Sequence, residues 1–183
     1  MSKHLTTPLT DEKIKDLKIG EEIFLSGIIY TARDAAHKKL VDLLKENKEL
    51  PFDIKGSVVY YVGPTPAQPG QAIGAAGPTT AYRMDPFVED MLSAGMKGMI
   101  GKGSRSKPVL ESIEKHCGVY FGATGGAAAL LSKTIKKAEV IAFDELGPEA
   151  VRKLEVKDMP LIVINDCEGN DLYIQGRNKW ENK

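Results

Sequence analysis

The stretch SVVYYVGPTPAQPGQAIGAAGPTTAYRMD, residues 57–85, decides how the chain is organised. Its first seven residues are almost continuously apolar, which predicts a buried central strand. The segment Gly63–Asp85 carries four prolines and four glycines, so it is neither a regular helix nor a central strand. An aperiodic segment of this length inside a compact domain is usually a functional loop, a linker or a disordered tail.

The end of this segment favours a functional loop. Thr79, Thr80 and Arg83 bring two hydroxyl groups and a cation together immediately before a helix start. The segment also leaves the end of a strand, which is where open α/β sheets commonly bind ligands. We therefore expect a binding site at this end of the loop.

Composition and charge narrow the class of protein. The chain has 183 residues, 42% of them hydrophobic and 27% charged, which is typical of a globular protein and predicts one domain over residues 1–183. Basic and acidic residues balance at 25 each, so net charge predicts no nucleic-acid partner. The sequence contains neither an apolar run of about 20 residues nor the apolar core of a signal peptide, so we expect no membrane partner and a cytoplasmic protein. Cys117 and Cys167 lack metal-ligand spacing, which predicts no metal site in this chain alone.

The elements before the loop are predicted from local patterns. We expect a short helix over Asp11–Leu17 and then a bent or bulged strand over 21–32, interrupted by Gly27. Thr31 and Asp34 have the spacing of a capping box, which predicts that a helix begins there. Its expected apolar face comprises Ala36, Leu40, Val41 and Leu44.

The elements after the loop alternate between helix and strand, which predicts an α/β domain with a mixed sheet in two or three layers. The predicted elements are a helix from Asp85 as N-cap to Ser93, a strand over 96–101, a helix from Ser106 to His116, a strand over 119–122, a helix over Ala127–Lys136, a strand over 138–146, a short helix over Pro148–Leu154 and a β-hairpin over 160–175 that turns at Glu168–Asn170.

Arg33 lies in the first turn of its predicted helix, where the helix macrodipole makes a cation mildly unfavourable. One interpretation pairs Arg33 with a nearby surface acid. The other combines its guanidinium with the free helix N–H groups as a receptor for a carboxylate or a phosphate. His37 lies four residues further on the same face, but a lone histidine is more often packed or solvated than catalytic.

Three basic or hydroxyl clusters follow predicted element ends. Lys102 is followed by Gly103 rather than by Ser or Thr, which excludes a Walker motif, and GATGG lacks the spacing of a dinucleotide fingerprint. Together the clusters predict a cationic pocket for a small polyanion, without paired carboxylates or a Cys/His nucleophile. The clusters are Arg33; Thr79, Thr80 and Arg83; and Lys102, Ser104 and Arg105.

Four motifs in register carry a resemblance to a known family. They are YTARDAAHKKL (30–40), VGPTPAQPGQAIGAAGPTTAYRMD (62–85), GKG (101–103) and FGATGGAAALL (121–131). Over about residues 7–174 the chain resembles the C-terminal domain of class I fumarate hydratases and the β subunit of two-chain fumarases and L(+)-tartrate dehydratases. The resemblance implies a swivelling β/β/α domain and a hydro-lyase whose [4Fe-4S] cluster is bound by three cysteines of an α subunit, a set that this chain lacks.

The resemblance also implies roles for single residues. It places the substrate-binding arginines at Arg33 and Arg83, the threonine proposed as catalytic base at Thr79 and the active-site lysine at Lys102. It implies reversible hydration of fumarate to (S)-malate in a complex with the α subunit, arranged as α2β2. The alternatives are an L(+)-tartrate dehydratase β subunit, a non-catalytic anion-binding or regulatory module of the same fold, and a chain that only stabilises its partner.

Overall fold

The computed structural model describes residues 2–123 and 128–181. The strands are β1 (Lys3–Thr6), β2 (Glu22–Thr31), β3 (Val58–Tyr60), β4 (Gly98–Gly101), β5 (Val119–Gly122), β6 (Ile135–Ala142) and β7 (Val151–Asn165). The α-helices are α1 (Asp11–Ile14), α2 (Asp34–Lys45), α3 (Asp85–Ser93), α4 (Lys107–His116), α5 (Ala128–Thr134) and α6 (Leu172–Glu181), and the 3₁₀ segments are η1 (Ala81–Met84) and η2 (Asp144–Glu149).

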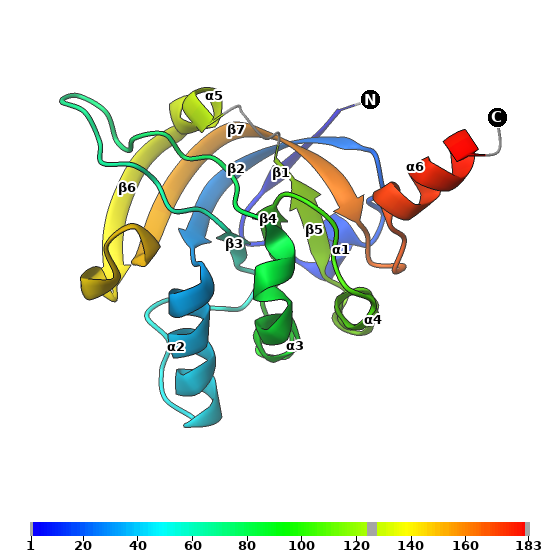
Figure 1. The fold of residues 1–183 in the computed structure, drawn as a ribbon, viewed down its shortest axis with the longest axis horizontal. Coiled ribbons are helices and arrows are strands. Elements are labelled where there is room, and N and C mark those ends of the chain that lie inside the picture. Colours follow the sequence, from blue (N-terminus) through cyan, green and yellow to red (C-terminus); the bar gives the residue numbers. More distant parts are fainter. Residues whose placement is uncertain (1, 124–127, 182–183) are drawn as a thin grey trace.

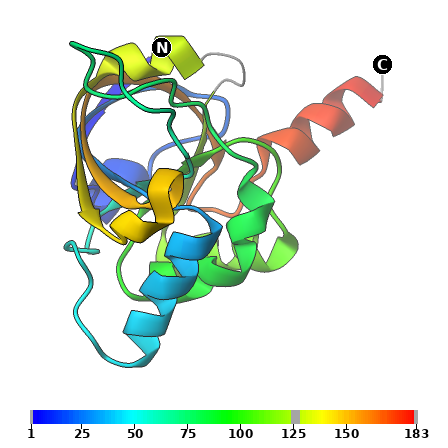
Figure 2. The ribbon, with the colours of Figure 1, turned by 60° about the vertical axis from the view of Figure 1, so that its left-hand side comes forward.

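The seven strands in the described part of the chain belong to one mixed sheet in the order β1-β2-β3-β4-β5-β7-β6. Strands β1 to β5 pair in parallel, whereas β7 is antiparallel to β2, β5 and β6. Because β7 bonds to both β5 and β2, the strands β2, β3, β4, β5 and β7 close into a ring, and Figure 2 shows the sheet curving round on itself. The predicted α/β class and mixed sheet are confirmed.

Two buried clusters of side chains explain the apolar run before the loop. Val58, Tyr60 and Val62 point into the ring, while Val59 and Tyr61 point outward against the helices. A strand that is covered on both faces needs apolar residues at every position rather than at alternate ones. Helices α2, α3 and α4 form the outer layer on that side (Figure 1).

The predicted bend at Gly27 is a β-bulge. The register between β2 and β7 shifts between Leu25 and Gly27, whose φ is 109°. A side chain at this position would also collide with the side chain and backbone of Thr7. Glycine is therefore required here for two separate reasons.

The predicted capping box at Thr31 is wrong. Thr31 is the last residue of β2, and its hydroxyl donates to the carbonyl of Ala150 at 3.2 Å and accepts the Arg152 N–H at 3.0 Å. Helix α2 instead begins at Asp34, with Arg33 at the N-cap and no side-chain cap. The hydroxyl binds β7 across the sheet, a long-range contact that the local pattern does not reveal.

The prediction that Asp85 is an N-cap is also wrong by one position. The 3₁₀ segment η1 leads directly into α3, so Asp85 is already helical and Met84 occupies the cap position. The end of α3 at Ser93 and the N-cap at Ser106 agree with the predictions. Helix α1 ends at Ile14, earlier than the predicted Leu17.

The C-terminal third differs most from the prediction. The predicted helix Pro148–Leu154 is wrong, because Pro148 lies in η2 and the chain from Val151 onward forms strand β7. The predicted hairpin is wrong as well, since 151–165 is a single strand that pairs with three others. After the turn, Asp171 accepts the N–H groups of Tyr173 at 2.7 Å and Ile174 at 3.0 Å, and a helix begins where a return strand was expected.

The boundaries of two further elements differ from the predicted ones. The helix predicted over Ala127–Lys136 corresponds to α5, which ends at Thr134. The first residue of the predicted helix, Ala127, lies outside the described part of the chain. The strand predicted over 138–146 begins at Ile135 and ends at Ala142, where Phe143 adopts a left-handed conformation. No helix in the described part of the chain is long and apolar enough to cross a membrane.

Candidate functional site

The parallel strands bring the predicted site residues to one edge of the sheet. Arg33 follows the carboxyl end of β2, the proline-rich loop follows β3, and Lys102 follows β4. Because neighbouring parallel strands end at the same edge, these segments meet there. The segment 124–127 after β5, part of the predicted glycine turn, lies outside the described residues.

Backbone hydrogen bonds join the end of the loop to Lys102. The Thr79 N–H donates to the carbonyl of Tyr61 at 2.7 Å, and the Lys102 N–H donates to the carbonyl of Thr79 at 3.2 Å. The Ala81 N–H then donates to the carbonyl of Lys102 at 2.8 Å. Thr79 and Lys102, predicted to act together, are thus neighbours. Thr79 is half-buried and Lys102 is exposed.

The two predicted substrate-binding arginines share one counter-ion. Arg83 Nη2 lies 2.9 Å from Asp34 Oδ2, and Arg33 Nε lies 3.9 Å from the same oxygen. Arg33 Nη2 also lies 3.7 Å from Glu149 Oε1. Glu149 is held in turn by the Ala35 N–H, which donates to its Oε2 at 2.9 Å. The Asp34 carboxylate therefore lies between the two guanidinium groups.

The contacts of Arg33 fit the first interpretation of this residue. It is paired with nearby acids, as the first interpretation expects. Its Nε is buried and has no hydrogen-bond partner among the described residues. Gly63 provides the space, since a Cβ there would lie 2.6 Å from Arg33 Nη1.

Arg105, expected to belong to the cationic pocket, is a buried structural residue. Its side chain is fully buried, its Nε donates to Asp85 Oδ1 at 2.8 Å, and its guanidinium lies over the rings of Tyr61 and Tyr120. The other oxygen of Asp85 accepts the Ser106 N–H at 2.8 Å. This arrangement fastens the loop after β4 to the start of α3.

His37 is a packed residue. It is 1% exposed and lies against the rings of Tyr61 and Phe87. Its Nδ1 is 3.0 Å from the carbonyl oxygen of Arg33, so the ring supports the N-cap of α2. Burial lowers the pKa of His37 to about 4, so its ring is neutral at pH 7.

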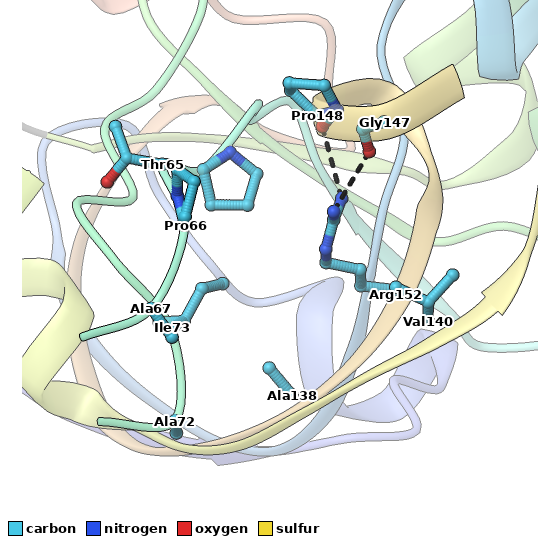
Figure 3. Close-up of a pocket in the computed structure, with 11 residues that line it drawn as sticks. Thr65, Pro66, Ala67, Ala72, Ile73, Ala138, Val140, Gly147, Pro148 and Arg152 are labelled. Carbon is cyan, nitrogen blue, oxygen red and sulfur yellow. Dashed lines mark hydrogen bonds between the residues drawn. The ribbon is translucent and has the colours of Figure 1, made fainter. Parts of the chain in front are cut away.

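The cavity in Figure 3 is separate from these residues. It has a volume of about 370 Å³ and lies between the proline-rich loop and the strands β6 and β7. The Arg152 guanidinium points into it but donates to three carbonyl groups, those of Gly147, Pro148 and Ala150, at 3.0 to 3.2 Å. None of the four predicted site residues lines this cavity.

Sequence reasoning missed three residues of the candidate site. Asp34 stands beside Arg33 in the ARDAAH motif, but the local pattern suggested only a helix cap. The sequence offers one signal for Gly63, namely that it is the first glycine after an apolar run. Glu149 reaches the site from η2, and nothing in its local sequence points there.

The fold and these contacts define a class: a single α/β unit with a mixed sheet and paired arginines at the edge of its parallel strands. Residues 2–176 match the family model described as Fumarase C-terminus. The chain belongs to this family, and the predicted resemblance is confirmed.

Named relatives agree with this assignment. The chain is 42% identical to a putative L(+)-tartrate dehydratase subunit beta of Methanocaldococcus jannaschii, over 90% of this chain and 88% of the relative. It is 42% identical to fumarate hydratase 2 of Leishmania major and 41% identical to the anaerobic class I fumarate hydratase of Escherichia coli. Those matches cover 88% and 91% of this chain but only 29% and 31% of the relatives. All three names are those of hydro-lyases or their subunits.

Proposed function

We propose that this chain is the β subunit of a two-chain class I fumarate hydratase and supplies half of a hydro-lyase site. The observation that carries the proposal is the meeting of Arg33, Thr79, Arg83 and Lys102 at one edge of the parallel strands. The proposed reaction is the reversible hydration of fumarate to (S)-malate. A similarity that spans 88% of the subunit from Methanocaldococcus jannaschii but less than a third of the two fumarate hydratases supports the role of a separate subunit.

In this proposal Arg33 and Arg83 bind the carboxylates of the substrate. A guanidinium holds a carboxylate through two parallel hydrogen bonds, which orients as well as attracts it. Asp34 keeps the two guanidinium groups together before the substrate arrives. Orientation of this kind lowers the barrier only if the reacting carbon lies beside the residue that transfers the proton.

Thr79 and Lys102 are the proposed proton-transfer pair. A threonine hydroxyl is a poor base in water, so an adjacent cation must stabilise its alkoxide. Lys102 suits this role because its backbone is bonded to that of Thr79 and its side chain is exposed at the same edge. In this assignment the carboxylate-binding residues lie at the N-cap of α2 and in η1, and the proton-transfer residues lie at the adjoining loop ends.

The [4Fe-4S] cluster implied by the resemblance does not fit this chain. Among residues 2–123 and 128–181 no group of three His, Cys, Asp or Glu residues is arranged to bind a metal ion. Cys117 precedes β5 and Cys167 follows the antiparallel β7, so both lie at the opposite edge of the sheet from Lys102. We therefore assign the cluster to an α partner, in an α2β2 complex.

An exposed aromatic residue supports a partner at this edge. Tyr82, next to Arg83 in η1, is 62% exposed. A large aromatic side chain beside a candidate site is typical of a surface that another chain covers. Arg83 and Lys102 are also exposed at this edge.

Reconstitution tests the proposal. The purified chain is mixed with an α subunit that carries the cluster, and consumption of fumarate and of L(+)-tartrate is followed separately. We expect fumarate hydration by the mixture and none by either chain alone. Selective turnover of L(+)-tartrate would favour the second candidate, which the archaeal relative's name supports. A stable complex that turns over neither compound would leave only an anion-binding module or a stabilising subunit.

A further inference from the structure

The two cysteines lie side by side at the edge of the sheet opposite the candidate site. Cys117 Sγ is 2.6 Å from Cys167 Sγ, although 50 positions separate them in the sequence. The pairing of Tyr120 with Asn165 explains this proximity, because it places the amino end of β5 beside the carboxyl end of the antiparallel β7. The contact therefore follows from the sheet itself rather than from a chance approach of two loops.

Both cysteines are held by ordered backbone. Cys117 ends α4 in a left-handed conformation, with φ 46°, a region that non-glycine residues seldom occupy. Cys167 lies in the turn after β7, where the buried Asp166 carboxylate accepts the N–H groups of Glu168 at 3.1 Å and Asn170 at 3.2 Å. Cys167 Sγ also donates to the carbonyl of Gly118 at 3.3 Å.

We propose that Cys117 and Cys167 form a reversible intramolecular disulfide in the folded chain when a small-molecule disulfide such as glutathione disulfide is present. A disulfide requires two sulfur atoms within about 2.05 Å on suitably directed side chains, and this pair is already in contact. Both residues are partly exposed, so a small oxidant reaches them.

The reaction is thiol–disulfide exchange. One cysteine, as thiolate, attacks glutathione disulfide, forms a mixed disulfide and releases one glutathione thiol. The second cysteine attacks the mixed disulfide at the protein sulfur, forms the Cys117–Cys167 bond and releases the second glutathione. The protein loses two electrons and two protons, and glutathione disulfide is reduced to two thiols. Burial raises the pKa of the Cys167 thiol, which disfavours it as the attacking thiolate.

The bond would tie the end of α4 to the base of α6. Figures 1 and 2 both show α6 projecting from the body of the molecule, and Cys167 lies five positions before its first residue. Fixing that turn restricts how α6 leaves the sheet. The link also closes a long loop, for which the loss of unfolded-state entropy is large.

Mass spectrometry of the full chain tests the proposal. Reduced protein is incubated with excess glutathione disulfide, and its intact mass and non-reducing peptide map are measured. We expect the loss of two hydrogen atoms, a linked pair of peptides that contain Cys117 and Cys167, and the return of both thiols after dithiothreitol. Glutathione adducts alone, disulfide-linked dimers or unreacted thiols would each overturn the proposal.

Thermal unfolding adds a second readout with its own control. The oxidised chain should unfold at least about 4 °C above the reduced chain, as expected for a strain-free cross-link in a chain of this size. Cys167→Ser should take up a single glutathione on Cys117 and show no such increase. An unchanged or lower unfolding temperature of the cross-linked wild type would show that the bond does not fit the native fold.

Discussion

At the level of single residues, the proton-transfer role proposed for Thr79 is the most specific assignment. If it transfers the proton, Thr79→Ala should lower kcat of the reconstituted complex by about 100-fold or more and change KM little, because the hydroxyl acts mainly in the transition state. Steady-state kinetics of fumarate hydration measure this. Thr80→Ala is the matched control, since Thr80 is the adjacent, equally half-buried threonine. Equal kinetics for both variants would remove Thr79 from the mechanism.

His37 gives a prediction that does not depend on activity. Its pKa falls from its ordinary value near 6.5 in the unfolded chain to about 4 in the fold. Between these values the unfolded chain binds more protons, so the stabilisation is complete above pH 6.5 and is lost as the pH falls toward 4. A shift of this size corresponds to roughly 3 kcal/mol over the whole range.

Urea denaturation at pH 7 and pH 5 measures this effect. The wild-type free energy of unfolding should fall by about 2 kcal/mol between these two pH values, and His37→Gln should show a much smaller decrease. Glu89, whose pKa is lowered to about 2 by hydrogen bonds from Lys115, Ser112 and His116, contributes mostly at lower pH. The same decrease in both proteins would contradict a neutral, buried His37.

At the scale of the element, Gly27 determines the bend of β2. Gly27→Val should destabilise the fold by about 2 kcal/mol or more, because a side chain would strain a residue at φ 109° and collide with Thr7. Gly176→Ala in α6 is the control, since its Cβ would meet no atom within 4 Å. We expect that variant to be neutral or more stable by up to about 1 kcal/mol in urea denaturation. An equal loss of unfolding free energy in Gly27→Val and Gly176→Ala would show that the bulge does not require glycine.

The buried ion pair between Arg105 and Asp85 fixes the loop after β4 to α3. Asp85→Ala leaves the fully buried Arg105 guanidinium without its counter-ion, so it should cost about 3 to 5 kcal/mol in unfolding free energy. Glu111→Ala removes the partner of an exposed ion pair with Lys107 in α4 and should cost less than about 1 kcal/mol. Chemical denaturation of both variants gives the comparison. A loss below about 1 kcal/mol for Asp85→Ala would refute a structural role for the pair.

Local patterns predicted the elements whose signals are local. The apolar run before Gly63, the glycine bulge at position 27 and the N-cap at Ser106 all appear as expected. The largest errors lie where a distant strand decides the structure. Thr31 bonds to β7 instead of capping a helix. The fifteen residues of β7 were predicted as parts of a helix and a hairpin, but three partner strands hold them extended.

The residues of the candidate site were likewise predicted where their signals are local and missed where their contacts are distant. Arg33, Thr79, Arg83 and Lys102 were predicted from junctions between elements and from the resemblance, and parallel pairing brings these junctions to one edge. The carboxylates that orient the arginines were not predicted. Glu149 reaches Arg33 from more than a hundred positions away, and the burial of Arg105 became visible only from its neighbours Tyr61 and Tyr120.

At the scale of the whole molecule, the proline-rich loop of 63–85 is, in our proposal, one wall of a site that a second chain completes. It extends the edge of the sheet, brings Thr79 to Lys102 and ends in the 3₁₀ segment that presents Arg83 to Asp34. Its prolines restrict the unfolded chain, so the loop loses less entropy when it is fixed. The rest of the site, in our proposal, comes from the α subunit.

The measurement that tests this account most directly is the activity of a complex carrying Arg83→Met. The variant should assemble with the α subunit as the wild type does, while kcat/KM for fumarate falls by at least about 100-fold, because a charged two-point contact with the substrate is lost. Arg177→Met, which removes an exposed arginine of α6 paired with Glu181, should keep full activity. Wild-type turnover by the assembled Arg83→Met complex would contradict the claim that this chain completes the active site.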